Sequence, residues 1–70
     1  MASKIRKQFG RRIKKLRKNR KMTQEELADS AGVERSYMGA IERGERSPTL
    51  DKIAAIAKAL KVSAGELLPF

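Results

Sequence analysis

The amino-acid sequence predicts an all-α fold of five short helices packed around one small core. Three observations support this fold class. Apolar residues recur at helical spacing, residues that suit helix starts precede several of these stretches, and no stretch alternates apolar and polar residues as a strand would. A chain of 70 residues is long enough for one domain. We therefore expect residues 1–70 to form a single domain, with residues 1–3 as a flexible arm.

The first predicted helix covers residues 4 to about 18. One stripe of apolar residues recurs there at spacings of 4, 4 and 3: Ile5, Phe9, Ile13 and Leu16. Gly10 within this helix costs about 1 kcal/mol relative to alanine, so we expect another element to approach closely at that point. We interpret the segment as a core helix with a solvated basic face. The alternative is a membrane-surface helix with Phe9 in the lipid, which would leave too few large apolar residues to fold the rest of the chain.

The second predicted helix begins at Gln24. Thr23 and Glu26 have the spacing of a capping box, in which each side chain bonds the backbone of the other residue. The inward-facing residues of this helix are Leu27, Ala28 and Ala31. Gly32 can adopt a left-handed backbone conformation that other residues resist, so the helix is expected to end there.

A third helix is predicted from about Glu34 to Arg43, closed by Gly44. Two helices with so short a connection must cross at a steep angle. The sequence therefore predicts a helix-turn-helix at about residues 24–43.

Two further helices follow. Thr49 is a suitable N-cap for a helix over residues 50–60. Its buried stripe is expected to consist of Leu50, Ile53, Ala57 and Leu60, with Ile56 at the border. Ser63 and Glu66 repeat the capping-box spacing before a last helix over residues 64–68.

The composition argues against an enzyme. The chain contains no cysteine and no histidine, so Ser/His/Asp and Cys/His arrangements and the usual metal sites are excluded. Glu25 and Asp29 share a helix face, but acidic residues near a helix start are favoured by the helix dipole alone. We expect no catalytic residues, no metal, no cofactor and no small-molecule substrate. No apolar run is long enough to span a bilayer, so we expect a cytoplasmic protein without a membrane partner.

The charge is large and uneven. Of the 17 lysines and arginines, 11 fall within residues 1–21, which contain no acid. Residues 22–70 carry six bases against eight acids. Such an imbalance indicates a polyanionic partner, either nucleic acid or an anionic membrane.

The helix-turn-helix favours double-stranded DNA, because its second helix enters the major groove with its N-terminal residues against the bases. The candidate base contacts are Glu34, Arg35, Ser36 and Ala40. Arg35 is the strongest, since its fork matches guanine O6 and N7. Tyr37 offers a ring and a hydroxyl for the DNA backbone, although it could equally be a packed surface aromatic. A purely structural helical hairpin remains the alternative at this point.

Six segments of the sequence resemble the lambda-repressor-like helix-turn-helix family (XRE), which contains the phage repressors and Cro. They are Ile13–Arg17, Met22–Ala28, Gly32–Val33, Ile41–Gly44, Ser47–Leu50 and Ala57–Leu60, in family order and spacing. The resemblance covers about residues 9–68 and implies a compact five-helix DNA-binding domain that acts in transcription, as an activator or a repressor. Residues 35–38 are further similar to controller proteins of restriction–modification systems.

The resemblance also implies roles at matching positions. Gln24 would bind a phosphate and steady the third helix, and Arg17 and Glu42 would form a structural ion pair. Arg43 and Arg46 would lie along adjacent phosphates. Glu34 departs from the family, which usually has serine or threonine at that cap.

One domain of this size reads few base pairs, so we expect a homodimer on a near-palindromic operator. The half-sites would lie about 34 Å apart. The apolar end of the chain is the expected dimer interface: Leu67, Leu68 and Phe70. Two other functions remain open: an antitoxin that binds DNA and a toxin, and a non-specific polyanion or membrane-surface binder.

Overall fold

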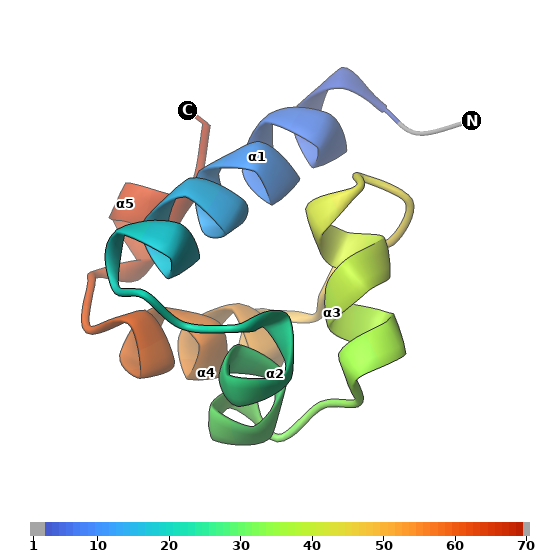
Figure 1. The fold of residues 1–70 in the computed structure, drawn as a ribbon. Helices are drawn as coiled ribbons and strands as arrows, with labels where there is room; N and C mark the ends of the chain where they lie inside the picture. The colour runs from blue at the N-terminus through green and yellow to red at the C-terminus, as the bar shows by residue number, and fades with distance from the viewer. Residues whose placement is uncertain (1–2, 70) are drawn as a thin grey trace.

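The computed structural model describes residues 3–69, which form five helices in the order that the sequence predicts. The helices are α1 (Lys4–Asn19), α2 (Gln24–Ala31), α3 (Arg35–Glu42), α4 (Leu50–Leu60) and α5 (Ala64–Leu67). In Figure 1, α1 runs along one side of the molecule, α2 and α4 lie opposite, α3 stands at one end, and α5 lies beside α1. The all-α fold class is thereby confirmed. None of the described helices is both long enough and apolar enough to cross a membrane.

Helix α1 begins one residue after a serine cap. The Ser3 Oγ accepts from the Arg6 amide at 3.1 Å, so Ser3 belongs to the helix start and not to a flexible arm. The other arm residues, Met1 and Ala2, lie outside the described residues. Phe9 and Ile13 are buried as predicted, and Leu16 packs against the core. Ile5 is an exception, because it lies in the first turn of α1 and is 57% exposed.

The close approach predicted at Gly10 is made by the C-terminal end of α3. A Cβ atom added to Gly10 would lie 2.5 Å from the Glu42 carbonyl oxygen and would also clash with the Ile41 carbonyl oxygen. Gly44, with φ +78°, packs in the same way against the backbone of Lys7. Two glycines therefore hold α1 tightly against the end of α3.

The helix-turn-helix forms as the sequence predicts. Both halves of the Thr23–Glu26 capping box are present at the start of α2. Gly32 ends α2 in the left-handed conformation, with φ 72°. Leu27, Ala28 and Ala31 are all buried. Helix α3 spans Arg35–Glu42, so the predicted end residues Glu34 and Arg43 are its N-cap and C-cap.

Helix α4 has the predicted bounds, but two residues of its predicted buried stripe differ in exposure from the prediction. Thr49 caps its start by accepting from the Lys52 amide at 3.3 Å. Leu50 is 83% exposed, and Ile56, placed at the border by the sequence, is fully buried. The prediction for Leu50 was wrong because this residue lies in the first turn, beyond the edge of the core. Ile53 is half-buried, and Ala57 and Leu60 are buried.

Helix α5 ends at Leu67, one residue earlier than predicted. Of the predicted Ser63–Glu66 capping box, one half forms: the Ser63 amide donates to Glu66 Oε2 at 2.8 Å, while the Ser63 hydroxyl makes no cap hydrogen bond. Leu67 has no exposed surface, and Arg12 Nε of α1 donates to the Glu66 carbonyl oxygen at 2.7 Å. The first and last helices are therefore joined directly.

The hydrophobic core draws on all five helices. Its members are Phe9, Ile13, Leu27, Ala28, Ala31, Met38, Ile41, Ile56, Ala57, Leu60 and Leu67. Helix α2 sits between α3 and α4, and α1 packs on α3. This core fixes the start of α3 relative to the start of α2, which positions the candidate site.

Candidate nucleic-acid interface

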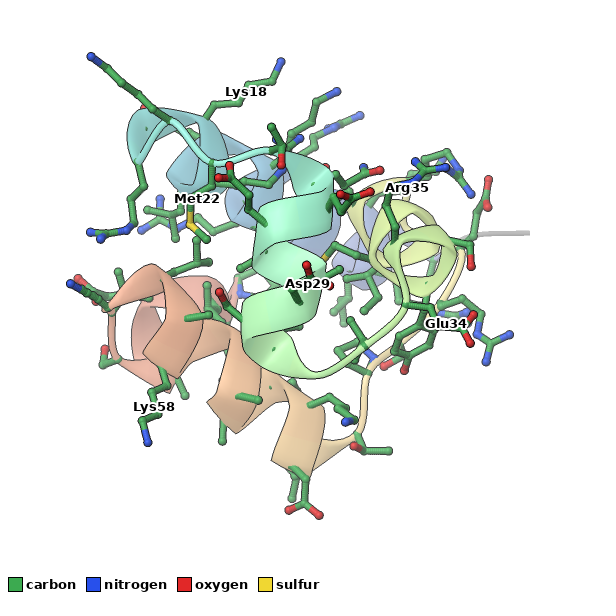
Figure 2. All side chains as sticks on the ribbon, turned by 60° about the horizontal axis from the view of Figure 1, so that its bottom comes forward. Lys18, Met22, Asp29, Glu34, Arg35 and Lys58 are labelled. Atoms are coloured by element: carbon green, nitrogen blue, oxygen red, sulfur yellow. The ribbon has the colours of Figure 1, made fainter. Side chains whose placement is uncertain are left out.

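The start of α3 presents its first side chains to solvent. Glu34, Arg35 and Ser36 are exposed, whereas Met38 and Ile41 hold the opposite face of α3 in the core. Figure 2 shows Arg35 and Glu34 at the outer edge of α3, far from Lys58 on α4. Glu34 occupies the N-cap position with an extended backbone (φ −75°, ψ 149°) but makes no side-chain cap hydrogen bond. Its carboxylate is therefore available to a partner outside the helix.

A chain of hydrogen bonds links Arg35 to α1. The Arg35 Nη1 atom donates to Gln24 Oε1 at 3.4 Å. Gln24 Nε2 in turn donates to Glu42 Oε1 at 3.1 Å. Glu42 forms a bidentate ion pair with Arg17, with distances of 2.7 Å from Nε and 3.0 Å from Nη2. The structure thus brings the predicted reader, the predicted phosphate ligand and the predicted ion pair into one network.

The ion pair is almost completely buried. The side chains of Arg17 and Glu42 are 10% and 3% exposed. Arg17 Nη1 also donates to the Met22 carbonyl oxygen at 2.9 Å, so each guanidinium nitrogen has a partner. A buried charge pair with all its hydrogen bonds made costs little, but removal of one partner leaves a buried charge without compensation. The pair therefore fixes α1, the start of α2 and the end of α3 relative to one another.

Gly39 leaves room for the Gln24 side chain against α3. A Cβ atom added to Gly39 would lie 3.3 Å from Gln24 Oε1 and 3.1 Å from Arg43 Nη1. Gly39 is itself buried, so it does not form the low outer surface that a base contact would use. Ala40, its neighbour, is half-buried on the outer side.

Tyr37 packs with Arg46 beside α3. The Arg46 guanidinium lies 5.3 Å from the centre of the Tyr37 ring, within the range of a cation–π contact. The two residues border a shallow hollow that is also lined by Glu34, Ser36, Ala40 and Glu45. The predicted base contacts Ser36 and Ala40 therefore lie along the same hollow as the predicted phosphate contacts Tyr37 and Arg46.

Basic side chains surround the end of α3 and cover the outer face of α1. Arg43 pairs with Glu45 at 3.1 Å, and both side chains are more than half exposed, so this pair contributes little to stability. The exposed basic residues of α1 that share its outer face are Lys4, Lys7, Arg11, Lys14, Lys15 and Lys18. Figure 2 shows Lys18 pointing into solvent. This face has no acid and can attract the phosphates of a duplex.

Of the predicted dimer residues, the structure describes Leu67 and Leu68. Leu67 is fully buried, so this prediction was wrong: Leu67 fills the space between α5 and the core. Leu68 is half-buried, and Phe70 lies outside the described residues. The large exposed apolar side chains of residues 3–69 are instead Ile5 and Leu50.

An apolar hollow of about 180 Å³ lies beside Ile5. Its lining also includes Phe9, Pro48, Ile53 and Leu68. Sequence reasoning missed the exposure of Ile5 and Leu50 because it assigned both to buried stripes by their spacing. Their position in the first turn of a helix was the available signal. Within residues 3–69, no group of three or more acidic side chains could hold a metal ion.

Comparison with known proteins identifies the family. The helix-turn-helix family model HTH_3 matches residues 13–67. The chain is 41% identical over 71 residues to the control protein C.BamHI of Bacillus amyloliquefaciens, covering all of this chain and 88% of that protein. It is also 42% identical over 59 residues to the immunity repressor protein of Bacillus phage phi105, covering 84% of this chain but only 41% of the repressor.

Solved structures agree with these sequence matches. The restriction–modification controller protein C.AhdI from Aeromonas hydrophila superimposes with a TM-score of 0.88 at 40% identity, over 90% of this chain and 96% of that chain. The DNA-binding domain of the P22 c2 repressor gives a TM-score of 0.82 at 34% identity, over 84% of this chain and 78% of that domain. The family model, the controller match and the five-helix fold lead to one conclusion. The chain belongs to the lambda-repressor-like (XRE) helix-turn-helix family of DNA-binding transcriptional regulators, which are not enzymes.

Proposed function

We propose that the chain acts as a homodimer that binds a near-palindromic operator in double-stranded DNA with sequence specificity. The observation that carries this proposal is the exposed Arg35 at the start of α3, held at one nitrogen by Gln24. A guanidinium has five donors in a fixed fork, so the donors not bonded to Gln24 remain available to a guanine. The acid-free basic face of α1 would attract the phosphates of DNA, whatever the base sequence.

The residues around Arg35 divide into base and phosphate contacts. Ser36 and Ala40 follow Arg35 along the outer side of α3, where they would meet base edges. Glu34, with no bond to its own helix, would accept from a cytosine amino group. The flanking phosphates would be bound by Gln24, Tyr37, Arg43 and Arg46.

The dimer would use exposed apolar side chains, of which Leu50 and Ile5 are the large ones among the described residues. In a twofold dimer both subunits use the same surface, so each exposed apolar residue is buried once on each subunit. Leu50, at 83% exposure, offers the largest unburied apolar side chain of the described residues. Two half-sites would then lie about 34 Å apart, one turn of the duplex.

The specific role that the comparisons favour is a controller of a restriction–modification system. The similarity extends over 88% of one such control protein and 96% of the structure of another. A phage-type repressor is the second candidate, supported by 42% identity to an immunity repressor. Enrichment of bound host DNA upstream of a restriction endonuclease gene would support the first role, and enrichment upstream of phage genes the second.

Selection of binding sites from a random DNA pool tests the proposal. We expect a two-half-site consensus, and binding that weakens steeply with salt, by about one log unit per log of salt for each phosphate neutralised. Arg35→Ala should relax preference at one base pair in each half-site and weaken binding by about 1–3 kcal/mol. Lys58→Ala is the matched control, because it removes the same charge from the opposite side of the molecule (Figure 2). Recovery of no consensus, with equal affinity for heparin and random DNA, would refute the proposal.

A further inference from the structure

We propose that the buried Arg17–Glu42 ion pair sets the orientation of the Gln24 amide and thereby holds Arg35 in position for base recognition. The pair would then be part of the specificity mechanism and not only a structural contact. Glu42 is the central residue of this proposal, because it bonds both Arg17 and Gln24. The inference rests on the proposed function of Arg35 as the base reader.

The first step is that Glu42 is held at both of its carboxylate oxygens. Arg17 engages both of its carboxylate oxygens, at 2.7 and 3.0 Å. Arg17 is fixed in turn by the Met22 carbonyl oxygen at 2.9 Å. With side-chain exposures of 10% and 3%, neither charge can exchange its partner for water. The Oε1 atom of Glu42 is therefore a fixed acceptor at the boundary between core and surface.

The second step is that this acceptor determines which way the Gln24 amide faces. An ionised carboxylate only accepts hydrogen bonds. Gln24 must therefore present its NH₂ group to Glu42, as it does at 3.1 Å. A flipped amide would place its oxygen against the carboxylate, where two acceptors would face each other without a donor between them. Gln24 Oε1 is consequently directed outward, toward the start of α3.

The third step is that this oxygen meets Arg35. The Arg35 Nη1 atom donates to it at 3.4 Å. The amide has room to lie there because residue 39 is a glycine, whose added Cβ would be 3.3 Å from the same oxygen. The bond is long, so it restricts where the guanidinium lies more than it adds stability. Restricting a long side chain before binding reduces the entropy lost in the complex.

A folded protein without the ion pair provides the test. Arg17→Met combined with Glu42→Leu replaces the pair by apolar residues of similar size, a change that is often neutral for stability. Thermal unfolding shows whether the double variant folds. The readout is discrimination between bases at the position that Arg35→Ala identifies, compared with discrimination at all other positions of the operator.

We expect the double variant to lose at least fivefold of the discrimination at the Arg35 position while retaining it elsewhere. The dependence of binding on salt should remain as in the wild type. Gln24→Met, which keeps the length but removes the amide, should cause the same loss of discrimination at the Arg35 position, together with a uniform loss of affinity from its phosphate contact. Adding Gln24→Met to the double variant should cause no further loss of discrimination, because both interrupt the same chain of contacts. Glu45→Gln is the control, since it breaks the exposed Arg43–Glu45 pair of 3.1 Å and should leave discrimination unchanged.

Two results would overturn the inference. One is a folded double variant that discriminates at the Arg35 position as the wild type does. The other is a loss spread evenly over all positions, which a merely structural pair would produce. If the double variant does not fold, Gln24→Met alone decides by the same criteria. A wild type without any operator preference would refute the proposed function, whereas normal preference with no effect of these variants would refute this inference alone.

Discussion

Replacing Gly10 by alanine tests the packing of α1 on α3. In isolation the change should stabilise α1 by about 1 kcal/mol, because alanine favours helix over glycine. The structure predicts the opposite outcome. The new Cβ would lie 2.5 Å from the Glu42 carbonyl oxygen and 2.8 Å from its carbonyl carbon. Both are backbone atoms, so no side chain can rotate away.

The size of the effect follows from the movement that the methyl group requires. Ordinary contacts of a Cβ begin at 3.4 Å, so α1 must separate from the end of α3 by roughly 1 Å. Overpacking of this kind costs about 1–3 kcal/mol. The same movement stretches the buried 2.7 Å contact between Arg17 and Glu42, which adds to the cost. We expect a net loss of about 2 kcal/mol, and therefore a fall in Tm of roughly 8–16 °C for a domain of this size.

Thermal and urea unfolding followed by circular dichroism provide the measurement. Gly65→Ala is the matched control, because the nearest atom to its added Cβ is Ser63 Oγ at 3.9 Å. This variant should be as stable as the wild type or slightly more stable. A Gly10→Ala protein that melts at or above the wild-type temperature would show that helix propensity outweighs the contact, and the reasoning would fail.

Three further predictions concern stability and assembly. Arg17→Met alone should destabilise the fold by about 3–5 kcal/mol, because it leaves the Glu42 charge buried without a partner. Adding Glu42→Leu should recover much of this loss. Equal stability of the single and double variants in urea unfolding would contradict the argument. Lys61→Gly should raise the free energy of unfolding by about 0.5–1 kcal/mol, since Lys61 ends α4 with φ 58°; an unchanged urea midpoint would show that this backbone is not strained. Leu50→Ser should weaken dimerisation at least tenfold in sedimentation experiments without changing monomer stability, because Leu50 is exposed. Leu67→Ala should instead cost about 2–5 kcal/mol of stability, because Leu67 is fully buried. A Leu50→Ser protein that dimerises normally would exclude Leu50 from the dimer interface.

Local chemistry made much of the fold predictable from the sequence. The caps at Thr23 and Thr49 and the left-handed Gly32 form as expected. Each depends on residues within a few positions of one another, so spacing alone is informative. The close approach at Gly10 was also predictable, because an unfavourable residue in a helix interior needs a packing reason.

The errors in predicted burial arose at residues whose exposure depends on their position along the helix as well as on the face they occupy. Periodicity gives the face on which a residue lies but not whether a neighbouring helix extends far enough to cover it. Ile5 and Leu50 lie on apolar stripes, yet both are in a first turn and remain exposed at 57% and 83%. Leu67 was the reverse case, because only the path of α5 back onto α1 shows that it is covered.

Residues of a candidate site could be named from the sequence, but the hydrogen bonds between them could not. The start of α3 follows from the helix-turn-helix, so Arg35 and its neighbours could be named. The bond between Gln24 and Glu42 joins positions 18 residues apart, and no sequence pattern relates an amide to one particular carboxylate at that distance. The network that links the reader to α1 was therefore visible only in the structure.

The hydrogen bond from Arg12 to the carbonyl of Glu66, 54 residues later, has a consequence for how the chain acquires its activity during synthesis. The DNA-reading helices leave the ribosome well before α5, but the core beneath them stays open until Leu67 has been added and the last helix has docked. A partly made chain would present basic charge without a firm recognition surface. A chain that lacks Leu67 and the residues after it should likewise pack α1 less firmly, although no residue of α1 is changed.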